Sequence, residues 1–196
     1  MSKLVVFNSV SLDGYFTDSR GDIGWAHRQD PEWNAFVGEN AGGGGVLLFG
    51  RVTYQMMASH WATDAGVRDN RAVAEGMSQV RKVVFSKTLT QVEWQNTTIV
   101  QGDLVTEVRE MKRQRGPDLV ILGSGSIVAQ LAWAGLIDEF QVVVVPVVLG
   151  AGRTMFEGAA GSGKSKSSDG PLNLKLLKSR SFKNGNVVLW YATDAR

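Results

Sequence analysis

Residues 119–127 read Leu-Val-Ile-Leu-Gly-Ser-Gly-Ser-Ile, so that four apolar residues run directly into a glycine-rich turn. Short, wholly apolar strands are expected where helices cover both faces of a parallel sheet. Ser126 can cap a helix in which Ile127 and Leu131 share one face. The stretch therefore predicts a buried strand, a tight turn and a helix, which is the repeating unit of an α/β fold.

Similar signals lie on both sides of this stretch. Further apolar or β-branched runs predict strands at residues 4–7, 46–49, 82–85 and 140–145. Asp30 followed by Pro31 predicts the start of a helix that passes through Phe36, because Asp suits the N-cap and Pro the first helical position. Asp103 predicts the start of another helix.

The end of the chain has a different pattern. Residues 172–182 and 187–191 are strand-like runs on either side of Asn184-Gly185, and Asn-Gly is a strong signal of a β-hairpin. The predicted fold class is α/β, with a mainly parallel, twisted sheet flanked by helices and a C-terminal antiparallel hairpin. A chain of 196 residues suits a single domain over residues 1–196.

Composition and charge argue against several classes of protein. The net charge is +2, from 21 basic and 19 acidic residues without a block of Lys or Arg, which argues against a nucleic-acid partner. The absence of cysteine excludes disulfides and thiolate metal sites. The longest apolar run, residues 142–149, is interrupted by Pro146 and is too short to span a membrane. Because the first residues lack the apolar core of a signal peptide, we expect a cytoplasmic protein with no membrane partner.

Residues 158–165 match the phosphate-binding pattern G-x-x-x-x-G-K-[ST]. A true P-loop follows a buried strand and opens a helix, whose free N–H groups hold the phosphates. Here the preceding strand is predicted to end near Leu149, and the residues after the match lack an apolar face and contain Gly170 and Pro171. We therefore interpret residues 157–171 as a flexible loop rather than as an ATP or GTP site.

Three other predicted strand ends carry groups that suit phosphate. Gly123-Ser124-Gly125 joins a strand to a helix, where a phosphate can approach the backbone, although a tight turn without a ligand has the same pattern. Arg51 follows Gly50 and carries a planar, permanently charged guanidinium, although a surface arginine would look the same. Ser86-Lys87 ends a third strand. Together they favour a phosphate-bearing ligand at the carboxyl ends of the strands.

Five short motifs occur in order along the chain. They are Ser11-Leu12-Asp13-Gly14-Tyr15, Gly50-Arg51-Val52-Thr53-Tyr54, Ser86-Lys87-Thr88-Leu89, Gly123-Ser124-Gly125, and Leu136-Ile137-Asp138-Glu139 with Pro146-Val147-Val148-Leu149-Gly150. The ordered set resembles the dihydrofolate-reductase-like family that includes the C-terminal reductase domain of the bifunctional riboflavin-biosynthesis deaminase–reductase. The match runs from about residue 3 to about residue 192, without a deaminase half.

The resemblance implies NADPH as the cofactor and a homodimer as the assembly. It implies that Arg51 and Thr53 contact the adenosine 2′-phosphate and the pyrophosphate. Ser86 and Lys87 would lie by the adenosine, and residues 123–126 would hold the pyrophosphate. The residues that it assigns to the cofactor are Gly50, Arg51, Val52, Thr53, Ser86, Lys87, Gly123, Ser124, Gly125 and Ser126.

Reduction also needs a proton, and two carboxylates are candidate catalytic residues. Asp30 resembles in its placement the folate-binding carboxylate of dihydrofolate reductases, although Asp-Pro-Glu equally suits a helix N-cap. Asp13 lies in a loop that is near the substrate in the riboflavin-pathway relatives, although Asp-Gly equally forms an ordinary turn.

Aromatic and histidine side chains are further candidates for contacts with a substrate or a metal ion. Trp25 and Tyr54 are candidates to stack on a flat heterocyclic substrate, although rings at such positions also form core or cleft wall. His27 and His60 have no third ligand at a suitable spacing, so no metal site is predicted.

The resemblance implies an NADPH-dependent reductase that transfers a hydride to a pteridine-, flavin- or pyrimidine-like heterocycle. One alternative is the riboflavin-pathway reaction itself, catalysed by 5-amino-6-(5-phosphoribosylamino)uracil reductase. Another is a nucleotide-binding module without turnover, which would keep the glycine motifs and show no hydride transfer.

Overall fold

The computed structural model describes residues 1–157 and 171–193. The stretch that matches the P-loop pattern, and all but the two end residues of the predicted loop at 157–171, lie outside these residues and remain sequence-based predictions. Within the described part of the chain, no helix is long and apolar enough to cross a membrane.

Strands and helices alternate along most of the chain. The strands are β1 Leu4–Ser11, β2 Tyr15–Thr17, β3 Val46–Gly50, β4 Lys82–Phe85, β5 Thr97–Val100, β6 Leu119–Leu122, β7 Glu139–Val145, β8 Arg153–Thr154, β9 Leu174–Ser181 and β10 Val187–Thr193. The helices are the 3₁₀ turn η1 Gly24–Ala26 and the α-helices α1 Pro31–Ala41, α2 Arg51–Trp61, α3 Asp64–Asp69, α4 Arg71–Gln79, α5 Leu104–Arg113 and α6 Gly125–Trp133.

Eight strands form one sheet in the order β5-β4-β3-β6-β1-β7-β10-β9. The first six strands of this order are mutually parallel, and β10 pairs antiparallel with both β7 and β9. The predicted mainly parallel sheet with a C-terminal antiparallel hairpin is therefore confirmed. Strands β2 and β8 form a separate two-stranded ribbon. Because β6 lies between β3 and β1, the strand order reverses at β6, and such reversals open a crevice at the carboxyl ends of the strands.

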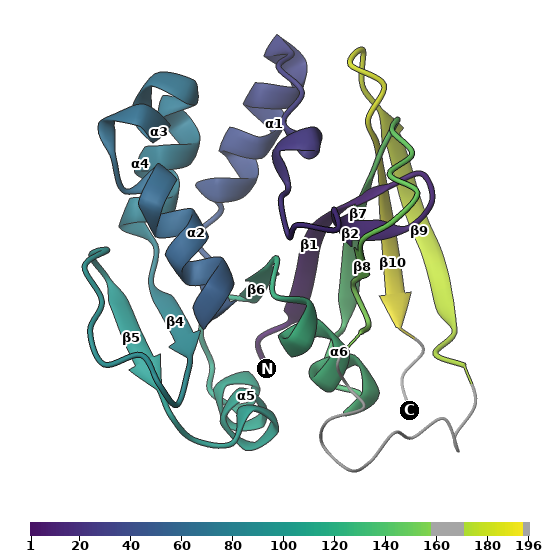
Figure 1. Cartoon of the computed structure of the whole chain (residues 1–196). Coiled ribbons are helices and arrows are strands. Elements are labelled where there is room, and N and C mark those ends of the chain that lie inside the picture. The colour runs from purple at the N-terminus through teal and green to yellow at the C-terminus, as the bar shows by residue number, and fades with distance from the viewer. Residues whose placement is uncertain (158–170, 194–196) are drawn as a thin grey trace.

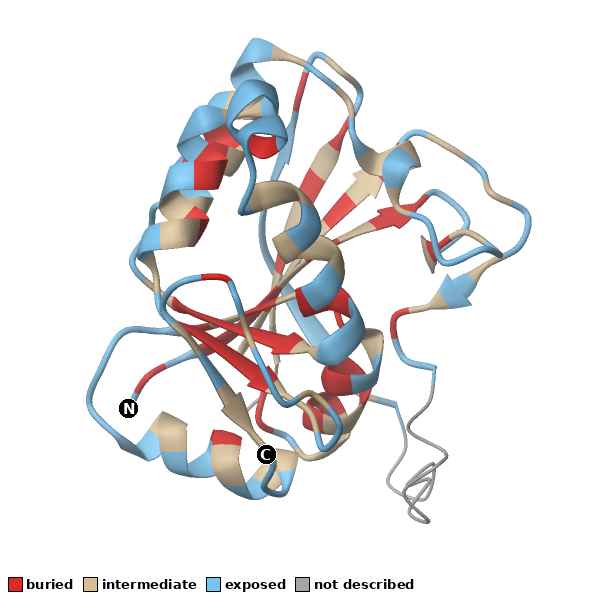
Figure 2. Ribbon diagram, turned by 60° about the vertical axis from the view of Figure 1, so that its left-hand side comes forward, coloured by how far each residue is buried: buried red, intermediate tan, exposed pale blue. Residues whose placement is uncertain are grey.

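The helices cover both faces of the sheet, as the apolar strands predict (Figure 1). Alternate side chains of one strand point to opposite faces. Leu48 and Ile121 belong to the core beneath α5 and α6, whereas Leu47 and Phe49 belong to the core beneath α2 and α4. The residues of α1 pack with β7 and β10 in a third cluster. Figure 2 shows the buried residues on the central strands and on the inner sides of the helices.

The helix starts show which predicted caps form. Asp30 accepts a hydrogen bond from Trp33 N at 3.0 Å and Asp103 accepts one from Thr106 N at 2.9 Å, so both predicted N-caps are confirmed. The predicted cap at Ser126 is wrong. Helix α6 begins two residues earlier, after Ser124, because the left-handed backbone of Ser124 (φ 57°) turns the chain directly into the helix.

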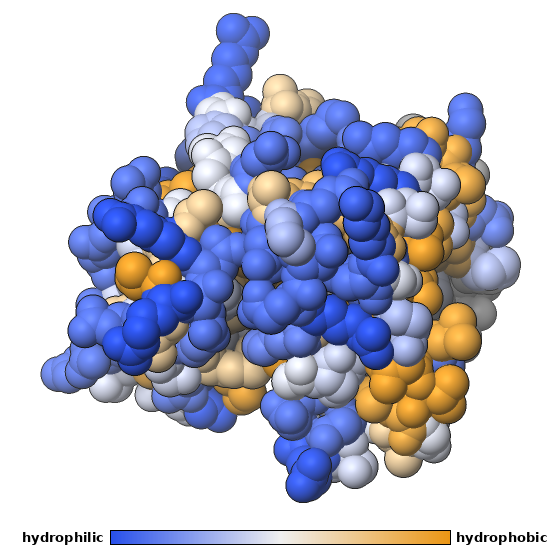
Figure 3. All heavy atoms as spheres, turned by 90° about the horizontal axis from the view of Figure 1, so that it is seen from above, coloured by the Kyte–Doolittle hydropathy of each residue, from blue (hydrophilic) through white to orange (hydrophobic). Residues whose placement is uncertain are grey.

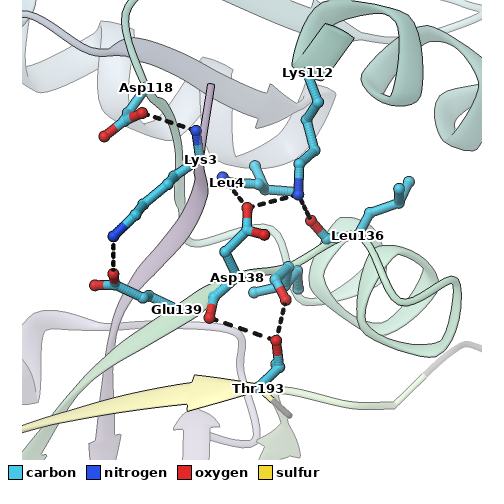
Figure 4. A network of polar contacts seen from close by, with 9 residues as sticks. Lys3, Leu4, Lys112, Asp118, Leu136, Asp138, Glu139 and Thr193 are labelled. Atoms are coloured by element: carbon cyan, nitrogen blue, oxygen red, sulfur yellow. Dashed lines mark hydrogen bonds and ion pairs between the residues drawn. The ribbon is translucent and has the colours of Figure 1, made fainter. Parts of the chain in front are cut away.

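A polar network joins the strands at their amino ends, at the opposite edge of the sheet from the crevice (Figure 4). Asp138 accepts hydrogen bonds from Lys112 Nζ at 2.5 Å and from Leu4 N at 2.6 Å. Lys3 Nζ donates to Glu139 Oε1 at 2.6 Å, and its backbone N–H donates to Asp118 at 2.8 Å. Asp138 and Glu139 at the start of β7, and Asp118 just before β6, thus all bond to the start of β1, and none of the three lines the cavities at the opposite edge.

Candidate functional site

Two adjoining cavities occupy the carboxyl edge of the parallel strands. The first has a volume of about 410 Å³ and lies between the ends of β3, β4 and β5 and the start of α6. The second has a volume of about 480 Å³ and lies between the ends of β1 and β6, the loop around η1, and helices α1, α2 and α3. Both are lined by Val52, Thr53, Ser124 and Ser126, so the two cavities meet at the turn between β6 and α6.

Two hydrogen bonds join that turn to the end of β3 and to the first turn of α2. Ser124 N donates to Thr53 Oγ1 at 3.0 Å, and Gly50 N donates to Ser124 Oγ at 2.8 Å. Gly123 has φ +65°, which glycine adopts without steric cost, and a Cβ atom there would meet Thr53 Cγ2 at 2.7 Å. The glycine is therefore required both by the backbone conformation and by the close approach of α2.

Asn8 holds the same turn from the other side. Its Oδ1 accepts from Gly123 N at 2.6 Å, and its Nδ2 donates to Gly123 O at 3.4 Å and to Met155 Sδ at 3.1 Å. Asn8 is buried and lines the second cavity. Sequence reasoning missed this residue, although a polar side chain that directly follows the apolar run at residues 4–7 is a usable signal.

The charges at the first cavity suit an anion. Helices α2 and α6 both begin there without a side-chain cap, so N–H groups of their first turns are available to a ligand, apart from that of Ile127, which donates to Ser124 O. Arg51 and Lys87 line the cavity and are exposed. Asp103 also lines it, and hydrogen bonds from the backbone N–H and hydroxyl of Thr106, assisted by the charge of Lys87, lower the pKa of Asp103.

All ten residues assigned to the cofactor line one or both of these cavities. They come from three strand ends that are separated in the sequence and adjacent in the sheet. Their predicted contacts with a cofactor remain predictions, and the structure supplies the shared location that those predictions require.

The second cavity has aromatic and apolar walls with a few polar groups. Its aromatic lining residues are Phe7, Phe16, Trp25, Trp33 and Trp61. Arg28 and Arg153 supply positive charge, and His60 Nε2 lies 3.0 Å from Asp69 Oδ2. Cavities that bind flat organic molecules combine apolar walls with a small number of placed polar groups in this way. No group of three or more potential ligand side chains among residues 1–157 and 171–193 is arranged to hold a metal ion.

The structure places the two predicted catalytic residues, Asp13 and Asp30, outside both of these cavities. Asp13 is exposed and accepts hydrogen bonds from Ser11 Oγ, Leu149 N and Gly150 N. The bond from Ser11, with those from the two backbone N–H groups, lowers the pKa of Asp13, which disfavours proton donation. Both carboxylates accept hydrogen bonds from backbone, Asp13 from the distant residues 149 and 150 and Asp30 from the first turn of its own helix.

The two predicted stacking residues have different positions. Trp25 lines the second cavity and donates from Nε1 to Asp22 O at 3.1 Å, and its contact with a substrate stays a prediction. Tyr54 is only 4% exposed and lines neither cavity. Its ring packs with Phe49 and Trp94 in the core under α2, away from both cavities.

Tyr54→Phe is therefore expected to affect stability and not substrate binding. The Tyr54 hydroxyl accepts a hydrogen bond from the buried Trp94 N–H at 3.3 Å, and its loss leaves that donor unpaired. We expect the free energy of unfolding to fall by about 1 kcal/mol. Urea denaturation measures this change, and an increase of more than about twofold in the KM of an active substrate would restore the ligand contact for Tyr54.

Comparisons with known proteins agree with this architecture. The model of the RibD C-terminal domain family matches residues 2–188. The uncharacterized protein YyaP of Bacillus subtilis is 24% identical over 191 residues, covering 96% of this chain and 94% of YyaP. A solved structure from Shewanella sp. PV-4, assigned by name to riboflavin biosynthesis, is 22% identical and superposes with a TM-score of 0.71 over 98% of this chain and 99% of that one.

A second solved structure relates the chain to part of a longer protein. It is the diaminohydroxyphosphoribosylaminopyrimidine deaminase/5-amino-6-(5-phosphoribosylamino)uracil reductase of Thermotoga maritima, with 14% identity and a TM-score of 0.65. The similarity covers 98% of this chain and 57% of that protein. At these identities, the superpositions show a shared fold.

Proposed function

The chain belongs to the RibD C-terminal domain family, and from this membership and the two joined cavities we propose that it is an NADPH-dependent reductase of a pteridine-, flavin- or pyrimidine-like heterocycle. The observation that carries the proposal is the turn at residues 123–125. It is shared by a charged cavity and an aromatic one and is cross-bonded to the end of β3. A dinucleotide needs such an arrangement, because its phosphates and its nicotinamide occupy different surroundings.

The residues of the first cavity fit the adenosine and phosphate half of the cofactor. The uncapped starts of α2 and α6 provide N–H groups for the pyrophosphate, and Arg51 and Lys87 provide charge for a 2′-phosphate. Glycine at position 123 lets the turn lie against Thr53, because a Cβ atom there would collide with the Thr53 methyl group. When bound, the dinucleotide supplies a hydride, and the protein supplies orientation and a dry surface.

The second cavity fits the substrate of such a reaction. Its aromatic walls bind a flat ring and exclude water, and Trp25 is the predicted stacking residue that lines it. Arg28 and Arg153 carry charges that would suit a phosphorylated substrate. This feature favours the alternative substrate, 5-amino-6-(5-phosphoribosylamino)uracil, within the same class of reaction. A nucleotide-binding module without turnover is the remaining alternative, and it predicts cofactor binding without NADPH oxidation.

Parallel calorimetric titrations with NADPH, NADH and ATP–Mg test the cofactor first. The proposal predicts NADPH binding with much weaker NADH and ATP binding. NADPH oxidation is then followed at 340 nm with dihydrofolate, flavins and the phosphoribosylaminouracil. Binding of ATP alone would contradict the proposal, whereas NADPH binding without oxidation of any of these substrates would favour the module without turnover.

Arg51→Ala is expected to weaken NADPH binding by about 10- to 100-fold while leaving NADH affinity nearly unchanged. The reason is that a guanidinium–phosphate contact contributes about 1.5–3 kcal/mol, and only NADPH carries the 2′-phosphate. Calorimetry on the purified variant measures both affinities. Arg113→Ala is the matched control, since Arg113 is also an exposed helical arginine but lies outside both cavities. Equal losses for the two cofactors would remove Arg51 from the 2′-phosphate site.

The homodimer implied by the resemblance is retained as a proposal, and the edge strand β9 is the surface proposed for it. The apolar run at residues 140–145 is an interior strand, paired with β1 and β10, and is not free to pair with another chain. The edge strand β9 instead exposes Leu174, Leu176 and Leu177. In Figure 3 hydrophobic atoms gather mainly along the right-hand margin of the molecule, the side on which β9 and β10 lie in Figure 1. Edge strands of this kind pair readily with a second copy.

A further inference from the structure

The second cavity contains few groups that can give up a proton. Arg28 and Arg153 stay charged at all physiological pH values and do not act as acids. The remaining titratable side chains among its lining residues are His27, His60 and Asp69. Since the geometry removes Asp13 and Asp30 from the cavities, a side-chain proton donor within the described structure has to come from this short set.

His60 is the member of the set whose ring lies against a carboxylate and an aromatic side chain. Its Nε2 lies 3.0 Å from Asp69 Oδ2, and its ring packs edge-on against Trp61 with centroids 4.7 Å apart and planes at 80°. The imidazole of His27 makes no hydrogen bond or ion pair with any residue in the ranges that the structure describes, and His27 is exposed. An acid–base residue oriented by a second group is the arrangement that proton transfer requires.

Helix α2 connects His60 to the phosphate-binding end of the site. Val52, Thr53, Met56, Met57 and His60 all line the second cavity. They recur at spacings of three and four, so they form one face of the helix. His60 lies eight residues beyond Val52, which is about 12 Å along the helix axis. The imidazole is thus at the opposite end of the cavity wall from the turn that meets the first cavity.

We propose that His60, held by Asp69, donates the proton that completes the reduction of the substrate. The proposal rests on the proposed function. A carbonyl or imine carbon of the substrate receives a hydride, with both electrons, from the dihydronicotinamide dinucleotide. As the π bond to the neighbouring oxygen or nitrogen breaks, that atom takes a proton from the His60 imidazolium, which becomes neutral imidazole. One C–H bond and one O–H or N–H bond form, and the substrate is reduced by two electrons.

The geometry assigns different tasks to the two residues. Asp69 Oδ2 lies within ion-pair distance of Nε2, so we assign the exchange of a proton with the ligand to Nδ1. Asp69 is assigned as a positioning residue, since its carboxylate favours a proton on Nε2 over one on Nδ1. The His60 side chain is 35% exposed, so water can return the proton after each turnover.

Two variants of His60 test the donor. With NADPH and 5-amino-6-(5-phosphoribosylamino)uracil, His60→Gln and His60→Ala are expected to lower kcat at least about 100-fold, the usual contribution of an acid catalyst. The calorimetric Kd for NADPH should stay within about twofold of wild type, and thermal melting checks that both variants fold. Added imidazole should restore part of the kcat of His60→Ala and none of that of His60→Gln, whose side chain fills the space. A kcat within threefold of wild type for both variants would overturn the proposal.

Nitrogen NMR of the cofactor-free protein provides a test that does not depend on turnover. The ring nitrogens of His60 should show the proton on Nε2 in the neutral form, and Asp69→Asn should abolish this preference and lower kcat about 10-fold. Glu75→Gln is the matched control, because it removes the carboxylate charge from another exposed pair, Arg71–Glu75, outside both cavities. A neutral His60 with its proton on Nδ1, or an equal effect of Glu75→Gln, would overturn the role of Asp69.

The outcomes separate this inference from the function on which it rests. If the wild-type protein oxidises NADPH with one of the heterocycles and the His60 variants match it, the reductase stands and the donor is wrong. A larger loss of kcat in His27→Gln than in His60→Gln would transfer the role to His27 and overturn the proposal. If the wild-type protein shows no turnover with any of them, the proposed function falls and the inference falls with it.

Discussion

Gly123→Ala is expected to weaken NADPH binding at least about 100-fold and to lower the free energy of unfolding by about 2–4 kcal/mol. Two effects add at this position. An alanine at φ +65° costs about 1 kcal/mol, because L-residues rarely adopt this conformation. Its Cβ would also lie 2.7 Å from Thr53 Cγ2, so Thr53 or the turn has to move. Either movement breaks the bond from Ser124 N to Thr53 Oγ1 and displaces the N–H groups that the proposed function assigns to the phosphates.

Two comparisons separate the strain from the collision. Gly135→Ala is the control for strain, because Gly135 has φ +66° and its Cβ would meet nothing within 4 Å. It should cost about 1 kcal/mol and leave NADPH binding unchanged. The double variant Gly123→Ala/Thr53→Ser removes the methyl group that collides and keeps the hydroxyl acceptor. The double variant should recover most of the stability that Gly123→Ala loses in excess of the backbone strain of about 1 kcal/mol. Chemical denaturation and calorimetry measure both quantities, and a Gly123→Ala variant that binds NADPH like wild type would contradict the role of the turn.

Lys82→Met is expected to lower the free energy of unfolding by about 2–4 kcal/mol. Lys82 is fully buried, and its Nζ donates to the carbonyl oxygens of Met77 at 2.6 Å, Val80 at 2.9 Å and Ser78 at 3.2 Å. Methionine keeps most of the volume but donates nothing, so the carbonyls of Met77 and Val80 lose this donor at about 1–3 kcal/mol each. The loss at Ser78 is smaller, because amide side chains nearby also donate to its carbonyl. The cation also lies 4.7 Å from the centre of the Trp94 ring.

The effect of Lys82 depends on pH in a definite direction. Burial lowers the pKa of Lys82 from 10.5 to about 8. Between these values the unfolded chain holds a proton that the folded protein has released, so the contribution of this group to stability rises with pH in this window. The difference between wild type and Lys82→Met should therefore widen from pH 8 to pH 10. Arg81→Met is the control, since Arg81 is the exposed neighbour, and urea denaturation should show a change within about 0.5 kcal/mol. A Lys82→Met variant as stable as this control would contradict the prediction.

Much of the fold could be predicted because its signals are local. The run at residues 119–122 is apolar throughout and is buried between β3 and β1, and the glycine turn and helix follow it directly. The Asn-Gly hairpin and the caps at Asp30 and Asp103 also depend on neighbouring residues only. Strand β5 was missed because its edge position leaves it partly exposed. The short helices α3 and α4 were missed because they meet at Asn70, without a long periodic pattern.

The candidate site also combines features that the sequence could predict with others that it could not. Adjacent residues of α2 show why the sequence could not assign every role: Thr53 bonds to the turn of β6, whereas Tyr54, about 100° further around the helix, points into the core. The sequence names the residue types but not the rotation of the helix about its axis. The surroundings of Asp13 and Asp30 could not be predicted for a related reason, since the backbone N–H groups that their carboxylates accept from are brought close by the fold.

By itself, the sequence determined the strand–turn–helix units and the strand ends that carry the glycines and the cations, because hydrophobic periodicity and turn chemistry act over a few residues. Only the tertiary structure decided which of those ends meet. The order of the strands places β6 between β3 and β1, and this brings Asn8, Thr53 and Gly123 together at one turn. The packing of α3 against α2 likewise places Asp69 beside His60. Such contacts depend on the packing of whole elements, which no local pattern encodes.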